Sequence, residues 1–88
     1  MKKIFVDGMS CDAYKIPTPN ASLLAIRSGS GMLACGYLKI ETAEKLGDAL
    51  AIVTGVGDFE QMLEKPVAAA ALGVRVGMSG REALICMK

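Results

Sequence analysis

Leu23-Leu24-Ala25-Ile26 and Met32-Leu33-Ala34-Cys35 are two continuous apolar runs, and they flank the turn Ser28-Gly29-Ser30-Gly31. Two apolar runs around a glycine-rich turn are typical of a β-hairpin. Because neither run alternates with polar residues, we expect both strands to lie in the centre of a sheet that is covered on both faces. This hairpin decides the fold, since the rest of so short a chain must pack around it.

Two more strands are predicted before the hairpin. Ile4–Val6 is β-branched and aromatic, and the turn signal Asp7-Gly8 follows it. From Cys11 to Ile16 apolar residues alternate with polar ones, with one interruption that favours a bulge in the strand. Residues 17–20, Pro-Thr-Pro-Asn, are predicted to be a loop, because a proline cannot donate a hydrogen bond to a neighbouring strand.

Beyond Leu38 the period of the apolar residues changes from that of a strand to that of a helix. Ala43, Leu46 and Leu50 fall on one face, and charged residues take the other. This spacing predicts an amphipathic helix over residues 43–50. The strand that begins at Met32 is expected to extend to Leu38, and the next strand is predicted at residues 51–54.

The last third of the chain predicts two short helices. Asp58, with Gln61 three residues later, is an N-cap pattern for a helix that Pro66 ends. Ser79 and Glu82 form a capping box that opens a C-terminal helix. The alanine-rich segment 67–72 fits either a strand or a helical turn. We therefore expect one α+β domain over residues 1–88, in which two or three short helices pack against a single mostly antiparallel or mixed sheet of four to six strands.

The composition excludes several classes of protein. The 88 residues are 52% apolar and carry ten basic and nine acidic groups, a formal net charge of +1. Such a balance is unlike that of a disordered chain, and the charges are too evenly spread to predict nucleic-acid binding. No apolar run approaches the roughly 18 residues needed to span a bilayer, so no membrane association is expected. The apolar excess favours a homo-oligomer, in which a partner copy covers part of the surface.

The residues available for chemistry are few. The chain contains no histidine, which is the usual general base and the commonest metal ligand. Its three cysteines, Cys11, Cys35 and Cys86, form no C-x-x-C motif, and we expect neither a metal nor a cofactor. The turn Gly55-Val56-Gly57 departs from the dinucleotide fingerprint, because Glu60 stands where a third glycine is required. An odd number of cysteines without a secretory signal favours reduced thiols and a cytoplasmic location.

Four residues are candidates for a small-ligand site, namely Asn20, Cys35, Gly36 and Gly55. If their strands are neighbours, they converge at one edge of the sheet together with the rest of the turn 55–58. Each also has a structural interpretation: Asn20 suits a turn, and Gly55 suits a positive φ. Free cysteine is a common core residue, and no histidine can take a proton from Cys35. We therefore expect its thiol to be buried and unreactive, and Cys35→Ser to destabilise the fold more than Cys35→Ala.

A series of short motifs in fixed order runs from about Ile16 to Leu84. They are 19–21 (Pro-Asn-Ala), 35–38 (Cys-Gly-Tyr-Leu), 41–48 (Glu-Thr-Ala-Glu-Lys-Leu-Gly-Asp), 53–56 (Val-Thr-Gly-Val), 72–74 (Leu-Gly-Val), 77–78 (Gly-Met) and 80–84 (Gly-Arg-Glu-Ala-Leu). In this order they resemble the YunC-like family of small uncharacterised bacterial and archaeal proteins. The resemblance implies a compact α+β fold and a domain of unknown function, and it brings no catalytic residues.

Two functions from different classes stay open. The first is a self-associating structural or regulatory module, which the apolar composition and the missing catalytic groups favour. The second is a small-ligand-binding protein or a cysteine-dependent enzyme, with a site around Asn20, Cys35-Gly36 and the turn 55–58. The sequence leaves open whether the protein is an enzyme and which small molecule it takes. The reactivity of Cys35 distinguishes the two hypotheses.

Overall fold

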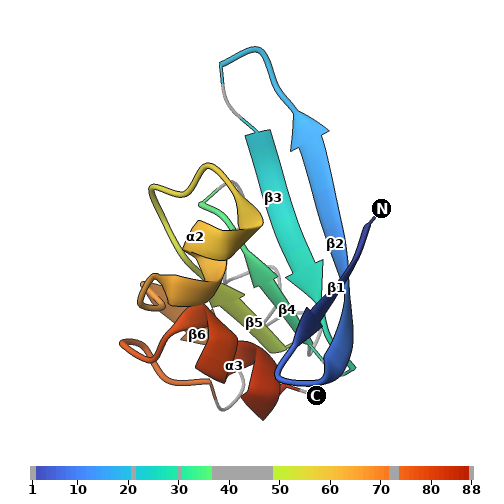
Figure 1. The fold of residues 1–88 in the computed structure, drawn as a ribbon. Helices are drawn as coiled ribbons and strands as arrows, with labels where there is room; N and C mark the ends of the chain where they lie inside the picture. The colour runs from blue at the N-terminus through green and yellow to red at the C-terminus, as the bar shows by residue number, and fades with distance from the viewer. Residues whose placement is uncertain (1, 21, 30, 37–48, 72–73, 88) are drawn as a thin grey trace.

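The computed structural model describes residues 2–20, 22–29, 31–36, 49–71 and 74–87. In these residues a six-stranded sheet packs against two helices (Figure 1). The strands are β1 (Lys2–Val6), β2 (Met9–Pro17), β3 (Ser22–Arg27), β4 (Gly31–Ala34), β5 (Ala49–Ile52) and β6 (Ala69–Ala71), and the helices are α2 (Phe59–Glu64) and α3 (Gly80–Cys86). The strands lie in the sheet in the order in which they occur along the chain. An α+β fold with a mixed sheet is therefore confirmed.

The hairpin on which the sequence prediction rests is formed by β3 and β4. Ile26 pairs with Leu33 in antiparallel register, and the Ser28 N–H donates to the Gly31 carbonyl at 2.9 Å. Both faces of this pair are buried, as the continuous apolar runs predict. The predicted strand from Met32 to Leu38 is too long, because β4 ends at Ala34. At the next residue, the sulfur of Cys35 and not its backbone carbonyl accepts the hydrogen bond from β3.

The β4 and β5 strands form the parallel pair of the sheet. Ala34 lies opposite Ile52, whereas the other pairings among the described strands are antiparallel. A parallel pair needs a crossover connection, and it brings the carboxyl ends of both strands to the same end of the sheet. The expected helix over residues 43–50 lies mostly outside the described residues. Its predicted end is wrong, because Leu50 belongs to β5, where it pairs with Met32 and Ala71.

The position of Leu50 also corrects the next prediction. β5 starts at Ala49, two residues before the strand predicted at 51–54, and it ends at Ile52. Leu50 fits a helical stripe, but it is also the start of the apolar run 50–53, and such a run suits a strand that is buried on both faces. The alanine-rich segment 67–72 resolves as a strand over 69–71, because its backbone pairs with β5.

The β1–β2 hairpin turns at Asp7 and Gly8, both of which have positive φ, 49° and 82°. Two residues with positive φ match the twist of a tight hairpin. The predicted bulge in β2 is wrong: the pairing with β1 and β3 runs without a break through residues 9–17. Ala13 and Tyr14 follow the ordinary alternation, since Ala13 is buried in the core and Tyr14 lies on the opposite face.

Pro17 was expected in a loop, and it is instead the last residue of β2, opposite Ser22. The alternation along β2 directs the backbone nitrogen of Pro17 away from β3, on the side where β1 has already ended. The missing N–H of this proline therefore breaks no bond between strands, which is the condition under which a strand tolerates proline.

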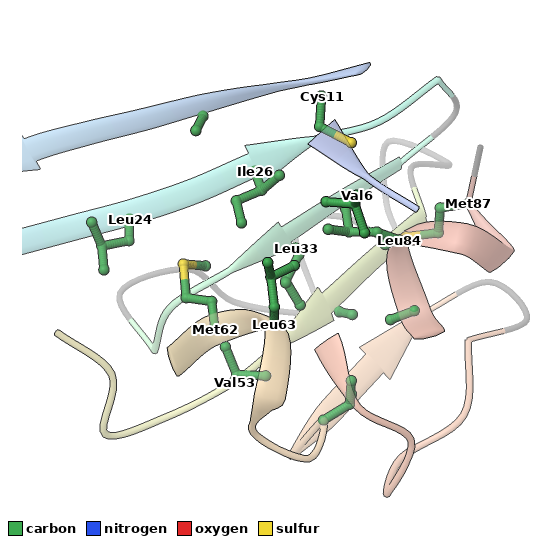
Figure 2. Close-up of a cluster of buried hydrophobic side chains, with 14 of the residues drawn as sticks. Val6, Cys11, Leu24, Ile26, Leu33, Val53, Met62, Leu63, Leu84 and Met87 are labelled. Carbon is green, nitrogen blue, oxygen red and sulfur yellow. The ribbon is translucent and has the colours of Figure 1, made fainter. Parts of the chain in front are cut away.

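Both helices lie on one face of the sheet, and the main hydrophobic core fills the space between (Figures 1 and 2). The predicted caps are present: the Asp58 carboxylate accepts the Gln61 N–H at 2.8 Å, and Ser79 and Glu82 cap α3 reciprocally. Figure 2 labels the main buried side chains of this core, which are Val6, Cys11, Leu24, Ile26, Leu33, Val53, Met62, Leu63, Leu84 and Met87. A smaller buried cluster lies on the other face, and its members are Ala25, Ala34, Leu50, Ile52 and Ala71.

Candidate functional site

Two of the predicted site residues, Cys35 and Gly36, follow the carboxyl end of β4 and lie beside the residues that follow the carboxyl end of β5. The Val53 N–H donates to the Ala34 carbonyl at 2.9 Å, which continues the parallel pairing one residue beyond β5. Cys35 and Gly36 therefore lie beside Val53 and Thr54. A Cβ atom on Gly36 would lie 3.6 Å from the Thr54 methyl group, which is an ordinary contact distance. Gly55 follows directly, so Cys35, Gly36 and Gly55 lie at the same end of β4 and β5.

The Cys35 side chain is part of the sheet's hydrogen bonding. Its backbone N–H donates to the Leu24 carbonyl at 3.0 Å, and the Leu24 N–H donates to the Cys35 sulfur at 3.3 Å. In a regular antiparallel pair the second of these bonds would go to a backbone carbonyl. The sulfur thus closes the β3–β4 pairing. Cys35 is 6% exposed, which confirms the expected burial of its side chain.

The turn between β5 and α2 is held by polar groups of the helix that follows. The Gly57 N–H donates to the Gln61 side-chain oxygen at 2.6 Å, and the Asp58 carboxylate accepts the Gln61 N–H. Gly55 has a φ of 68°, which explains the glycine there. The Lys65 ammonium lies close to it, 3.6 Å from where a Gly55 Cβ would stand. The polar groups of Asp58 and Gln61 therefore stabilise the turn.

Asn20 lies apart from the other three candidates. It is exposed, in the loop beyond the last β2–β3 pair, Pro17 and Ser22. The pairing between β3 and β4 reaches only as far as Leu24 and Cys35. In Figure 1 the tip of the β2–β3 hairpin extends well past the end of β4. Asn20 therefore projects beyond the edge at which the other three residues gather.

The thiols occupy three different environments. Cys11 and Cys35 are buried and Cys86 is exposed. Burial raises the pKa of the Cys11 thiol, and the nearby Asp12 carboxylate raises it further.

Among the described residues, no group of three or more histidine, cysteine or carboxylate side chains is placed to hold a metal ion. No helix in this part of the chain is long and apolar enough to cross a membrane.

Two ionic contacts surround the β1–β2 hairpin. The Lys3 ammonium lies 2.6 Å from the Asp12 carboxylate, and this hydrogen bond raises the pKa of Lys3. The Arg81 guanidinium contacts Glu64 at 3.0 Å and Asp7 at 3.5 Å, so one cation links α2, α3 and the hairpin turn. The hydrogen bond to Glu64 is the main cause of a raised pKa for Arg81.

Sequence reasoning missed two exposed apolar side chains on the first two strands. Phe5 is 73% exposed and Ile16 is 56% exposed. They lie on the same face of the sheet, and the Lys3–Asp12 ion pair and the partly buried Tyr14 lie between them. The signal was present in Ile4–Val6: in a strand the middle residue of three points to the opposite face from its neighbours. With Val6 in the core, Phe5 must point away from it.

These features define a small α+β protein, with two described helices on one face of a mixed sheet. A family model described as a domain of unknown function, DUF1805, matches residues 34–87. The chain is 32% identical over 93 residues to the uncharacterized protein YunC of Bacillus subtilis (strain 168), covering 96% of this chain and 92% of that protein. It therefore belongs to the DUF1805, or YunC-like, family, and the resemblance stated from the sequence is confirmed.

A solved structure supports the fold. The crystal structure of a protein of unknown function, TA1206 from Thermoplasma acidophilum, superposes with a TM-score of 0.92 at 30% sequence identity. The similarity covers 99% of this chain and 90% of that one. The arrangement of the described strands and helices is thus similar to that of the archaeal protein.

Proposed function

We propose that this protein is a self-associating structural or regulatory module. The observation that carries the proposal is Phe5, which is 73% exposed on a strand that has no neighbour on its outer side among the described residues. Such a strand edge is a place where a further strand can add. The proposal places the module in the cytoplasm, where its three free cysteines stay reduced.

The chemistry of the candidate site supports the same proposal. The Cys35 sulfur accepts a backbone hydrogen bond, and the Asp58 and Gln61 side chains hold their own turn. A nucleophile or a ligand-binding group needs atoms that face the substrate. Here these polar atoms face the protein's own backbone, so we assign them to folding.

The oligomeric state tests this proposal. Light scattering coupled to size-exclusion chromatography, from about 1 to about 100 µM protein, should give a mass near twice the 9.2 kDa of the chain. The fraction of dimer should rise with concentration. A monomer mass over the whole range would contradict self-association.

A small-ligand-binding protein or cysteine-dependent enzyme is the second candidate. It is favoured by the parallel pairing of β4 and β5, which gathers Cys35, Gly36 and Gly55 at the carboxyl ends of adjacent strands. Ligands in α/β sheets bind at such strand ends. Iodoacetamide labelling of the folded protein, with peptide mapping, measures the reactivity of each cysteine. Labelling of Cys35 faster than in an unfolded control would favour this candidate, and slower labelling would exclude a reaction that depends on the Cys35 thiol.

A further inference from the structure

The outer edge of β1 is an open strand edge. β1 is the first strand of the sheet and pairs with β2 on one side, and no strand among the described residues pairs with its other side. Such an edge presents a row of unpaired N–H and C=O groups, which are a template for pairing with a further strand. Only those residues of β1 whose backbone groups point away from β2 have N–H and C=O groups available for such pairing.

Two hydrogen bonds establish the alternation across the sheet. The Ser28 N–H donates to Gly31, and the Leu24 carbonyl accepts from Cys35, so even-numbered residues of β3 face β4. Odd-numbered residues of β3 therefore face β2, and their partners in β2 are even-numbered. The odd-numbered residues of β2 face β1, where they pair with Lys2, Ile4 and Val6. The backbone groups of Lys3 and Phe5 consequently point to the open edge.

We propose that a second copy of this chain pairs with this edge, β1 antiparallel to β1 across a two-fold axis, with Phe5 opposite the partner's Phe5. This inference rests on the proposed self-association and names its surface. In this register Phe5 and its counterpart exchange both backbone hydrogen bonds. Their rings then lie side by side on one face of a continuous sheet, where a cross-strand aromatic pair is stabilising. The side chain of Phe5, which is 73% exposed in the single chain, is then covered on the side that faces the partner's ring.

Charge and the aromatic pair select this register over its neighbours. With Phe5 at the axis, the two Lys3 ammonium groups lie on opposite sides of it, each beside its own Asp12. With Lys3 at the axis, two ammonium groups would face each other, which is destabilising. With Ile4 at the axis, Lys3 would lie opposite the partner's Phe5, and the aromatic pair would be lost. The pairing uses the β1 edge of both copies, so an assembly built through this edge closes at two chains.

A pair of lysine substitutions tests the surface. Phe5→Lys places like charges at the axis and should raise the dimer dissociation constant about tenfold or more. Ile16→Lys is the matched control: its side chain is also apolar and exposed, on the same face, but it is not at the β1 edge. It should leave the dissociation constant within about twofold. Circular dichroism and thermal unfolding verify that both variants fold.

A dimer that withstands Phe5→Lys would overturn this surface and leave self-association standing, whereas a monomeric wild-type chain would overturn both.

Discussion

Gly80, the first residue of α3, lies so close to the backbone carbonyl of Met62 in α2 that no Cβ atom fits between them. A side chain at this position would also come within 2.9 Å of a Leu33 methyl group in β4. The Gly80 N–H donates to the Lys65 carbonyl at 3.0 Å, which joins the start of α3 to the end of α2. The two helices can therefore share one face of a small sheet because the chain has glycine at this contact.

Gly80→Ala should destabilise the protein by about 1–3 kcal/mol, since a backbone carbonyl cannot move aside for the added methyl group. Gly36→Ala is the control, because its Cβ would meet Thr54 at an ordinary contact distance of 3.6 Å. Urea unfolding followed by circular dichroism measures both. Equal unfolding free energies for the two variants would show that the Gly80 contact is not needed.

Ser79→Ala should cost about 1 kcal/mol, because the Ser79 hydroxyl accepts the Glu82 N–H at 3.1 Å and caps α3. Glu82→Gln should cost less, since a glutamine can keep the return bond to the Ser79 N–H. Ser10→Ala, at an exposed position of β2, serves as the control and should be nearly neutral. Thermal unfolding of the three variants checks this order.

Cys35→Ala should be more destabilising than Cys35→Ser, which reverses the order expected from the sequence. Alanine leaves the Leu24 N–H without the sulfur that accepts it, at a cost of about 1–3 kcal/mol. A serine hydroxyl can still accept that bond. Urea unfolding of both variants measures the difference. If alanine were the milder replacement, the hydrogen bond to sulfur would contribute little.

Cys11 should make the protein less stable at alkaline pH. Burial raises the pKa of this thiol in the folded state, so the folded chain holds the proton more tightly than the unfolded chain. The contribution is complete below the unfolded pKa of about 8.5 and is lost as the pH rises through the folded pKa. The unfolding free energy should therefore fall between about pH 8 and pH 10, by at most about 1.4 kcal/mol per unit for this group.

Cys11→Ala should flatten this fall when urea unfolding is repeated across the same pH range. Cys86→Ala, which removes an exposed thiol, is the matched control and should leave the slope as in the wild type. A slope that is the same in all three proteins would show that Cys11 is not its source.

The sequence predicted those parts of the fold that depend on neighbouring residues. The β3–β4 hairpin follows from a glycine-rich turn between apolar runs, and the cap at Ser79 follows from a spacing of three residues. It also placed Cys35, Gly36 and Gly55 near one another, on the condition that their strands are adjacent. It did not place Asn20 beyond that edge, because the length of the β2–β3 hairpin depends on the pairing of Pro17.

What the sequence by itself determined is local: the hairpins, the helix caps and the alternation that buries Val6 and exposes Phe5. Only the tertiary structure decided that β4 pairs in parallel with β5, that the Cys35 sulfur closes the pairing with β3, and that no strand of the described residues pairs with the outer side of β1. Caps and turns are formed between residues a few positions apart, whose geometry is set by their own backbone. Strand order and edges depend on contacts between distant segments, and apolar burial, which drives those contacts, has no direction of its own.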